Sequence, residues 1–222
     1  MVSIAIDGPA GAGKSTIAKS VAHSLAFIYV DTGALYRAIG LFAIQNNISL
    51  TDEAALIACL SKVKIELGYR DGQQLIFLGG REVTKEIRGP EMGLVASSIS
   101  AFPGVRDFLL GLQRKMAETY NVIMDGRDIG TVVLPRADLK IFLTATPEDR
   151  AKRRYLEFVR RGEAISYDRV LEDIKLRDAK DMNRATSPLK PAEDAVILDT
   201  TGNDFEQSVA QVLEIIRKRG LA

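Results

Sequence analysis

Gly8-Pro9-Ala10-Gly11-Ala12-Gly13-Lys14-Ser15-Thr16 is the stretch that decides the fold of this chain. It fits the phosphate-loop (P-loop) pattern G-x-x-x-x-G-K-[ST], and it lies between an apolar run at 2–6 and a helical pattern at 17–26, which is the context the pattern requires. Glycines let backbone N–H groups face phosphate oxygens, and the helix N-terminus adds its positive dipole end. Lys14 can reach the β- and γ-phosphates, and the Ser15 hydroxyl can ligate Mg²⁺. We therefore predict that these residues bind ATP or GTP.

Apolar runs suited to buried parallel strands recur along the chain, with helical patterns between most of them. The runs lie at 2–6, 27–30, 121–124, 139–143 and 195–198. Such strands are apolar throughout because helices cover both faces of a parallel sheet. The pattern predicts an α/β P-loop NTPase fold, with a doubly wound, five-stranded parallel sheet and helices on both faces. Further helices are expected at 52–62, 90–100, 105–120 and 204–219, and Phe102-Pro103 should end the second of them.

One stretch departs from this rhythm. Alternating residues at 62–67, an Asp71-Gly72 turn and a Gly79-Gly80 turn predict a small antiparallel β-meander at about 62–88. The sequence leaves open whether this insert is a surface loop or a substrate-side subdomain that moves. We expect one P-loop domain over 1–222. Its parts would be a core at about 1–40, 89–146 and 186–222, the acceptor-side insert, and an arginine-rich lid at about 147–185.

Composition excludes several classes of protein. The net charge of +1 provides no field that favours nucleic acid or an anionic membrane. No segment approaches the roughly 18 uninterrupted apolar residues of a membrane span. The single cysteine, Cys59, cannot form an intrachain disulfide, and it is expected as a buried thiol in a reducing compartment. We expect a cytoplasmic, monomeric protein with no nucleic-acid or membrane partner.

A P-loop is shared by GTPases, motor ATPases and small-molecule kinases, so other residues must select the reaction. Asp31-Thr32-Gly33-Ala34-Leu35-Tyr36-Arg37 follows the second predicted strand, at the edge where open α/β sheets bind ligands. Asp31 or Thr32 can cap the next helix. Arg37 could then hold an acceptor phosphate through both of its terminal nitrogens, although a capped helix with a surface arginine is an equal alternative.

Asp125-Gly126-Arg127-Asp128 follows the apolar strand at 121–124. Asp125 at that position suits an outer-sphere partner of Mg²⁺. Arg127 and Asp128 would project over the cleft, one as a cation and the other as a hydrogen-bond acceptor for a base. The alternative is an Asp-Gly turn with solvated charges.

Eight of the chain's 18 arginines lie in 147–184. Arg150, Arg153, Arg154 and Arg161 are spaced to share one helix face, and Arg177, Asp181 and Arg184 another. A solvated, salt-bridged helix pair and a lid that closes on nucleotide phosphates both fit this pattern. Together with the P-loop and Arg37, the pattern favours phosphoryl transfer between two anions. Such a reaction needs positioning and charge neutralisation more than a general base.

The chain resembles the bacterial cytidylate kinase family in order over about residues 2–200. The segments that carry the likeness are Ile6-Asp7-Gly8-Pro9 with the P-loop, Asp31–Arg37, Ala101-Phe102-Pro103, Asp125–Val133 and Arg177–Arg184. The segments at 31–37 and 126–133 are the more specific. The resemblance implies that ATP and CMP or dCMP give ADP and CDP or dCDP with Mg²⁺ as cofactor. It also implies that the meander belongs to the acceptor side.

The same resemblance implies a role for individual residues. Cytosine contacts fall on Ser97, Arg106 and Asp128, acceptor-phosphate contacts on Arg37, Arg127 and Arg184, ribose contacts on Arg177 and Asp181, and an ATP contact on the lid residue Arg153. The predicted CMP site also includes Thr32, and the predicted catalytic residues are Lys14, Arg37, Arg127 and Arg184. Metal binding is expected at Ser15, with Asp125 behind it.

Base selection follows from hydrogen-bond chemistry. Asp128 can accept from the exocyclic amine of cytosine, whereas the carbonyl of uracil would face it acceptor to acceptor. We therefore expect CMP and dCMP to be used well ahead of UMP. Ser98 and Ser100 lie close to Ser97, so the serine that meets the base stays open. A kinase for another small acceptor and a nucleotide-switched binding protein are the alternative functions.

Overall fold

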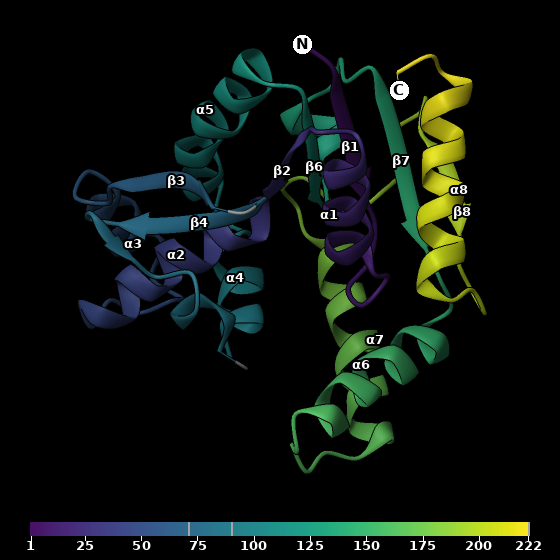
Figure 1. Ribbon diagram of the computed structural model, residues 1–222. Coiled ribbons are helices and arrows are strands. Elements are labelled where there is room, and N and C mark those ends of the chain that lie inside the picture. Colours follow the sequence, from purple (N-terminus) through teal and green to yellow (C-terminus); the bar gives the residue numbers. More distant parts are fainter. Residues whose placement is uncertain (71, 90, 222) are drawn as a thin grey trace.

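Five parallel strands form the central sheet of the computed structural model (Figure 1), which describes residues 1–70, 72–89 and 91–221. The strands are β1 (Ser3–Asp7), β2 (Ile28–Asp31), β6 (Val122–Gly126), β7 (Leu139–Thr144) and β8 (Val196–Asp199). Their order across the sheet is β2-β6-β1-β7-β8, and every neighbouring pair is parallel. Each corresponds to a predicted apolar run, so the predicted doubly wound sheet is confirmed.

The two faces of this sheet bury different residues of the same strand, because side chains alternate along a strand. Ile4 and Ile6 pack with α1 (Lys14–Ser24) and α8 (Phe205–Lys218), which lie together on one face (Figure 1). Ala5 belongs to the opposite core, with residues of α5 (Pro103–Thr119) and of η2 (Ile129–Val133), a single π-helical turn. Coverage of both faces explains why the strand sequences are apolar throughout.

A second body lies beside the edge strand β2. It contains α2 (Thr32–Gln45), α3 (Glu53–Leu60), α4 (Met92–Ile99) and the short helix η1 (Glu86–Arg88). The predicted meander is present as the antiparallel strands β3 (Ile65–Arg70), β4 (Gln73–Leu78) and β5 (Arg81–Glu82). Leu35, Ile39, Ile76 and Ile87 are among the buried side chains of its core. The predicted turn residue Asp71 and helix start Pro90 lie outside the described residues.

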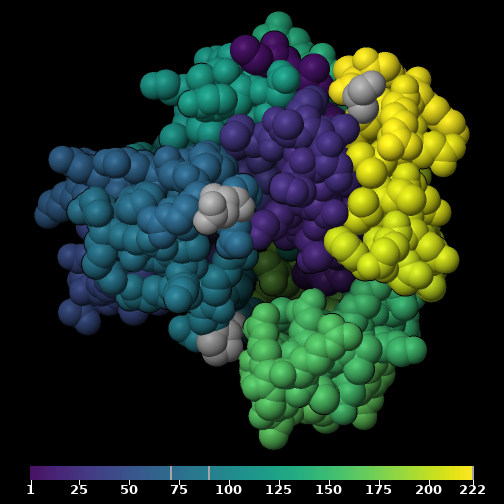
Figure 2. Space-filling view, viewed as in Figure 1, coloured from purple at the N-terminus to yellow at the C-terminus, as the bar shows by residue number. Residues whose placement is uncertain are grey.

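The helices α6 (Pro147–Arg160) and α7 (Tyr167–Asn183) pack on each other through Ala151, Val170 and Ile174. This pair lies beyond the carboxyl ends of the strands, and Figure 2 shows the surface hollowed between it and the body that contains α2–α4. Over the described residues, every helix is either too short or too polar to span a bilayer.

One predicted helix start and one predicted shared helix face were wrong. Helix α5 begins at Pro103, so Phe102-Pro103 opens this helix as well as ending the previous one. Proline suits a first helical turn because the N–H it lacks would have no partner there. Helix α7 ends at Asn183, with Arg184 in extended backbone just beyond. Arg184 therefore does not share a helix face with Arg177 and Asp181.

Candidate active site

The P-loop connects β1 to α1 through glycines that no other residue could replace without strain. Gly8 has φ 148°, and a Cβ there would lie 1.9 Å from the backbone oxygen of Leu143 on β7. Lys14 is buried, and its Nζ donates a hydrogen bond to the Pro9 backbone oxygen at 2.7 Å. Burial, and secondly the positive charge of Arg127, holds the pKa of Lys14 well below its usual value. An anion in the loop would relieve that unfavourable burial of charge.

Asp125, at the end of β6, joins three elements of the site. Its Oδ2 accepts a hydrogen bond from Ser15 Oγ at 2.7 Å, and its Oδ1 accepts one from Tyr29 OH at 2.8 Å. Thr32 Oγ1 donates to the Asp125 backbone oxygen at 2.7 Å. Burial, followed by the charge of Asp31, raises the pKa of Asp125. The paired Ser15 and Asp125 oxygens are a donor set that Mg²⁺ favours, because it takes oxygen ligands and retains waters between itself and outer carboxylates.

Several predicted acceptor residues are paired with carboxylates. Arg37 Nη2 lies 2.9 Å from Asp31 Oδ2, and Arg127 Nε lies 3.0 Å from Asp181 Oδ2. Burial and then the charge of Arg127 lower the pKa of Arg177 to about 10. Repulsion between these cations means that an anion placed among them would be stabilised.

Spare hydrogen-bond donors accompany this charge. Over the described part of the chain, three buried arginine nitrogens lack a hydrogen-bond partner: Arg37 Nε, Arg177 Nε and Arg184 Nη2. Buried donors without partners are costly, so their presence is typical of a site that a ligand completes. Phosphate oxygens are suitable partners for guanidinium groups.

The predicted base-binding residues also lie together. Arg106 is buried and donates hydrogen bonds to the Asp128 carboxylate and, at 3.2 Å, to the Ser100 backbone oxygen. Arg184 Nη2 lies 3.8 Å from the other Asp128 oxygen. The Ser100 hydroxyl donates to the Ser97 backbone oxygen at 3.0 Å. Asp128 thus lies at the centre of a buried group that contains both cationic donors and a serine turn.

Three of the lid arginines predicted to share a face, Arg150, Arg153 and Arg154, lie in α6, but their contacts differ. Arg150 is buried, donates to the Ala10 backbone oxygen at 2.7 Å and pairs with Asp178 at 2.6 Å. Arg153 instead donates to the Thr200 backbone oxygen at 2.5 Å. Arg154 lies over the Phe158 ring, 4.5 Å from its centre. Arg161 is exposed just after α6.

Arg150 therefore connects the α6–α7 pair to the P-loop, and sequence spacing gave no sign of that contact.

Some residues of the site had no predicted role. The Asp7 carboxylate accepts hydrogen bonds from the Ile129 and Gly130 N–H groups at 2.8 and 2.7 Å, and burial raises its pKa to about 6. Tyr29 lies within a strand pattern that indicates only core packing. Arg88 pairs with Asp31 at 2.8 Å. The position of Asp7, directly before the P-loop, is the one sequence signal that could have identified it.

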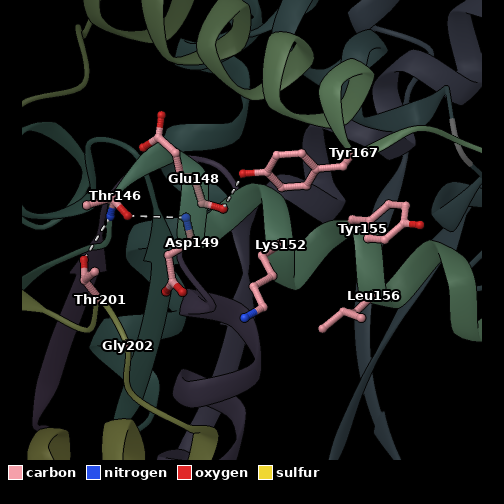
Figure 3. Close-up of a pocket in the computed structure, with 9 residues that line it drawn as sticks. All are labelled: Thr146, Glu148, Asp149, Lys152, Tyr155, Leu156, Tyr167, Thr201 and Gly202. Atoms are coloured by element: carbon pink, nitrogen blue, oxygen red, sulfur yellow. Dashed lines mark hydrogen bonds between the residues drawn. The ribbon is translucent and has the colours of Figure 1, made fainter.

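A hollow of about 600 Å³ lies along α6 (Figure 3). Its lining consists of Thr146, Glu148, Asp149, Lys152, Tyr155, Leu156, Tyr167, Thr201 and Gly202. Tyr167 OH donates to the Glu148 backbone oxygen at 3.3 Å, and the two tyrosine rings meet edge to face. Thr201 and Gly202 follow Thr200, the acceptor for Arg153. The hollow therefore adjoins the predicted donor side rather than the acceptor arginines.

Comparisons with known proteins agree with this arrangement. The family model described as cytidylate kinase matches residues 4–218. A cytidylate kinase from Caldanaerobacter subterraneus subsp. tengcongensis is 52% identical over 217 residues, which cover 98% of this chain and 95% of the relative. Another cytidylate kinase, from Caldicellulosiruptor bescii, is 50% identical over 217 residues, which cover 98% of this chain and 96% of the relative.

Among solved structures, an uncharacterized protein from Eubacterium ventriosum is similar with a TM-score of 0.54 and 12% sequence identity. The match covers 98% of this chain and 99% of the other. At that identity the likeness bears on the fold alone.

Proposed function

The chain belongs to the cytidylate kinase family, and from that membership we propose that it transfers the γ-phosphoryl group of ATP to CMP or dCMP, giving ADP and CDP or dCDP. One structural observation carries the proposal. Asp125 holds Ser15 of the P-loop, while Arg127, two residues further along the chain, pairs with Asp181 of α7. The P-loop and the arginines that we propose for the acceptor therefore lie at the end of one strand, which supports transfer between the two.

On the donor side, the backbone of the P-loop from Gly8 to Thr16 would surround the ATP phosphates, with Lys14 on the β- and γ-phosphates. Ser15 would hold Mg²⁺, and Asp125 would support that ion from behind by fixing the Ser15 hydroxyl. When bound, Mg²⁺ neutralises charge on the transferring phosphates. Arg153 lies between Gly13 and the Thr200 loop, which supports its role as an ATP contact.

On the acceptor side, Arg37, Arg127 and Arg184 would bind the phosphate of CMP, and Arg177 and Asp181 would contact its ribose. The unpaired nitrogens on three of these arginines support the assignment. Transfer between two phosphates requires no proton acceptor, because the attacking oxygen is already anionic. The arginines would orient that oxygen and stabilise the charge that spreads over the moving phosphoryl group.

For the base, Asp128 would accept from the cytosine amine, while Arg106 and a serine would donate to its ring acceptors. Ser97 is the better serine, because the Ser100 hydroxyl already donates to a backbone oxygen and Ser98 is exposed. Thr32 would contact CMP at the edge of the acceptor site through its hydroxyl, which in this structure donates to the Asp125 backbone oxygen.

We also propose that the meander at 62–88 forms the acceptor-side insert. Residues 147–185 would form a lid, because Arg150 connects the α6–α7 pair to the P-loop. The buried Cys59 thiol suits a reducing compartment, and the cytoplasm stays our predicted location. The monomeric state also stays a prediction.

A coupled assay of ADP release tests the function. Purified protein with ATP and Mg²⁺ should release ADP quickly with CMP or dCMP, much more slowly with UMP or AMP, and hardly at all without acceptor. Equal rates with UMP and CMP would contradict the proposed base recognition. Release that does not depend on an acceptor would indicate an ATPase or a nucleotide switch instead.

A further inference from the structure

Gln74 of β4 is a buried polar residue in a strand that otherwise buries apolar side chains. The side chains of β4 alternate, so that Gln73 is exposed while Gln74, Ile76 and Leu78 are buried. Burying a primary amide costs free energy unless its oxygen and nitrogen both find partners. Both partners of the Gln74 amide belong to one residue, Asp31, at the carboxyl end of β2.

The contact has the form of a strand pairing. Gln74 Oε1 accepts a hydrogen bond from the Asp31 backbone N–H at 2.6 Å, and Gln74 Nε2 donates to the Asp31 backbone oxygen at 3.4 Å. Strand β2 is at the edge of the five-stranded sheet. The side chain thus completes the pairing of the last residue of that edge strand, 43 positions earlier in the chain.

Asp31 in turn orients the acceptor arginine. Its Oδ1 caps α2 by accepting from the Ala34 N–H at 2.9 Å, and its Oδ2 pairs with Arg37 at 2.9 Å and with Arg88 of η1 at 2.8 Å. Burial alone would raise the pKa of Asp31, but the charges of Arg37 and Arg88 outweigh that effect and lower it. Two residues of the body that contains the meander therefore hold Asp31: Gln74 bonds its backbone, and Arg88 pairs with the same carboxylate oxygen as Arg37.

We propose that Gln74 is a positioning residue for phosphoryl transfer. It fixes the backbone of Asp31, and through the Asp31 carboxylate it fixes the direction in which Arg37 presents its nitrogens to the acceptor phosphate. Arg88 supports the same carboxylate from the exposed side. This inference rests on the proposed role of Arg37 in binding the CMP phosphate.

The test is steady-state kinetics of Gln74→Met, which keeps the side chain's length and removes both hydrogen bonds. Two lost hydrogen bonds should lower kcat/KM for CMP about tenfold. The KM for ATP should not change, because the P-loop is not touched. Gln73→Met is the matched control, since it makes the same change on the exposed side of the same strand. The loss of two buried hydrogen bonds should lower the melting temperature under either role, but a purely structural role would impair the use of CMP and of ATP alike.

A double variant tests whether Gln74 acts through Arg37. In an Arg37→Ala background, Gln74→Met should cause no further loss in kcat/KM for CMP, because residues that act in series are not additive. An additive loss, an equal rise in the KM for ATP, or an unchanged kcat/KM for CMP would each overturn the proposal.

If Gln74→Met does not fold, Arg88→Met tests whether support of Asp31 affects the use of CMP. The Arg88 side chain is half exposed, so its loss leaves the core intact. It should also weaken the use of CMP but not of ATP, while the exposed control Arg81→Met should not. An unchanged kcat/KM for CMP in Arg88→Met would overturn the proposal. Wild-type protein that fails to phosphorylate CMP would refute the proposed function, and wild-type activity with insensitive variants would refute only this inference.

Discussion

Ser15 Oγ donates a hydrogen bond to Asp125 Oδ2 over 2.7 Å, which joins the first turn of α1 to the end of β6. Ser15 itself is exposed, so its oxygen can also meet a ligand in the P-loop. The Asp125 carboxylate is buried and is held from its other side by Tyr29. The pair therefore presents one accessible oxygen that is oriented by a fixed carboxylate.

We expect Asp125→Asn to raise the Mg²⁺ concentration needed for half-maximal activity by about tenfold, because groups behind a metal ligand typically change metal affinity by that much or more. Activity measured against Mg²⁺ at constant ATP would show the shift. Asp138→Asn is the control, since Asp138 bonds Ser3 at the start of β1. An unchanged Mg²⁺ requirement in Asp125→Asn would remove Asp125 from the metal site.

Lys14→Ala should lower kcat by about a hundredfold or more, because it removes a charged donor aimed at the transferring phosphate. The fold should persist. Burial disfavours the Lys14 ammonium in the free protein, so the substitution removes an unfavourably buried charge. Thermal unfolding followed beside the kinetics would establish both points. Lys19→Ala, an exposed change on the same helix, should leave both quantities unaltered, and near-normal turnover in Lys14→Ala would refute the donor site.

Parts of this architecture follow from sequence because they depend on local pattern. The strands are apolar runs bounded by turns, and the P-loop is a contiguous segment whose glycines have a local geometric cause. The meander was predicted from a period of two residues and from its turn residues. For the same reason Asp31 was correctly expected among the candidate caps of α2, since its carboxylate accepts from an N–H three residues ahead.

The contacts that organise the site are mostly not local. Gln74 and Asp31 are 43 residues apart, and Asp7 and Ile129 are 122 apart. Nothing in the spacing of either pair predicts their approach, which depends on how β2 lies against the second body and how β1 lies against η2. Helical spacing also groups arginines by face without identifying what the face meets. That is why Arg150 and Arg153, three residues apart, have different partners.

Arg37→Ala should impair the use of CMP far more than that of ATP. Loss of one partner from a buried charged pair typically costs enough to lower kcat/KM for CMP about a hundredfold. Asp31 would keep Arg88 as a partner, so the protein should still fold. Kinetics with each substrate varied in turn would separate the two effects. Arg136→Ala, at an exposed position, is the control, and unchanged CMP kinetics in Arg37→Ala would show that this arginine does not bind the acceptor.

Asp128→Asn should narrow the preference for CMP over UMP by about tenfold or more, the usual contribution of a hydrogen bond to a charged group. An asparagine can turn its amide N–H toward the uracil carbonyl, which the wild-type carboxylate repels. The ratio of kcat/KM for the two acceptors is the measurement. Asp107→Asn, at the exposed α5 position directly after Arg106, is the control and should keep the wild-type ratio. If the ratio also persisted in Asp128→Asn, another group would have to read the base.

Asp7 gives the protein a pH dependence of stability that can be isolated by substitution. Burial raises its pKa in the folded state from 3.8 to about 6, although two backbone N–H groups act in the opposite direction. Between those values the folded protein binds the proton more tightly than the unfolded chain does. The contribution of Asp7 to the free energy of unfolding is therefore greatest below pH 3.8 and is lost as the pH rises through about 6.

Asp7→Asn removes this titration. The free energy of unfolding of Asp7→Asn minus that of the wild type should therefore increase from pH 4 to pH 7, by roughly 3 kcal/mol if the full shift of about two pKa units applies. Any constant cost of placing an amide against the Ile129 and Gly130 N–H groups would displace the curve without changing its slope. Urea unfolding of both proteins at several pH values would measure this difference in the free energy of unfolding, with Asp138→Asn as the exposed control. A difference that stayed flat, or that fell as the pH rose, would mean that Asp7 is not a buried acid with a raised pKa.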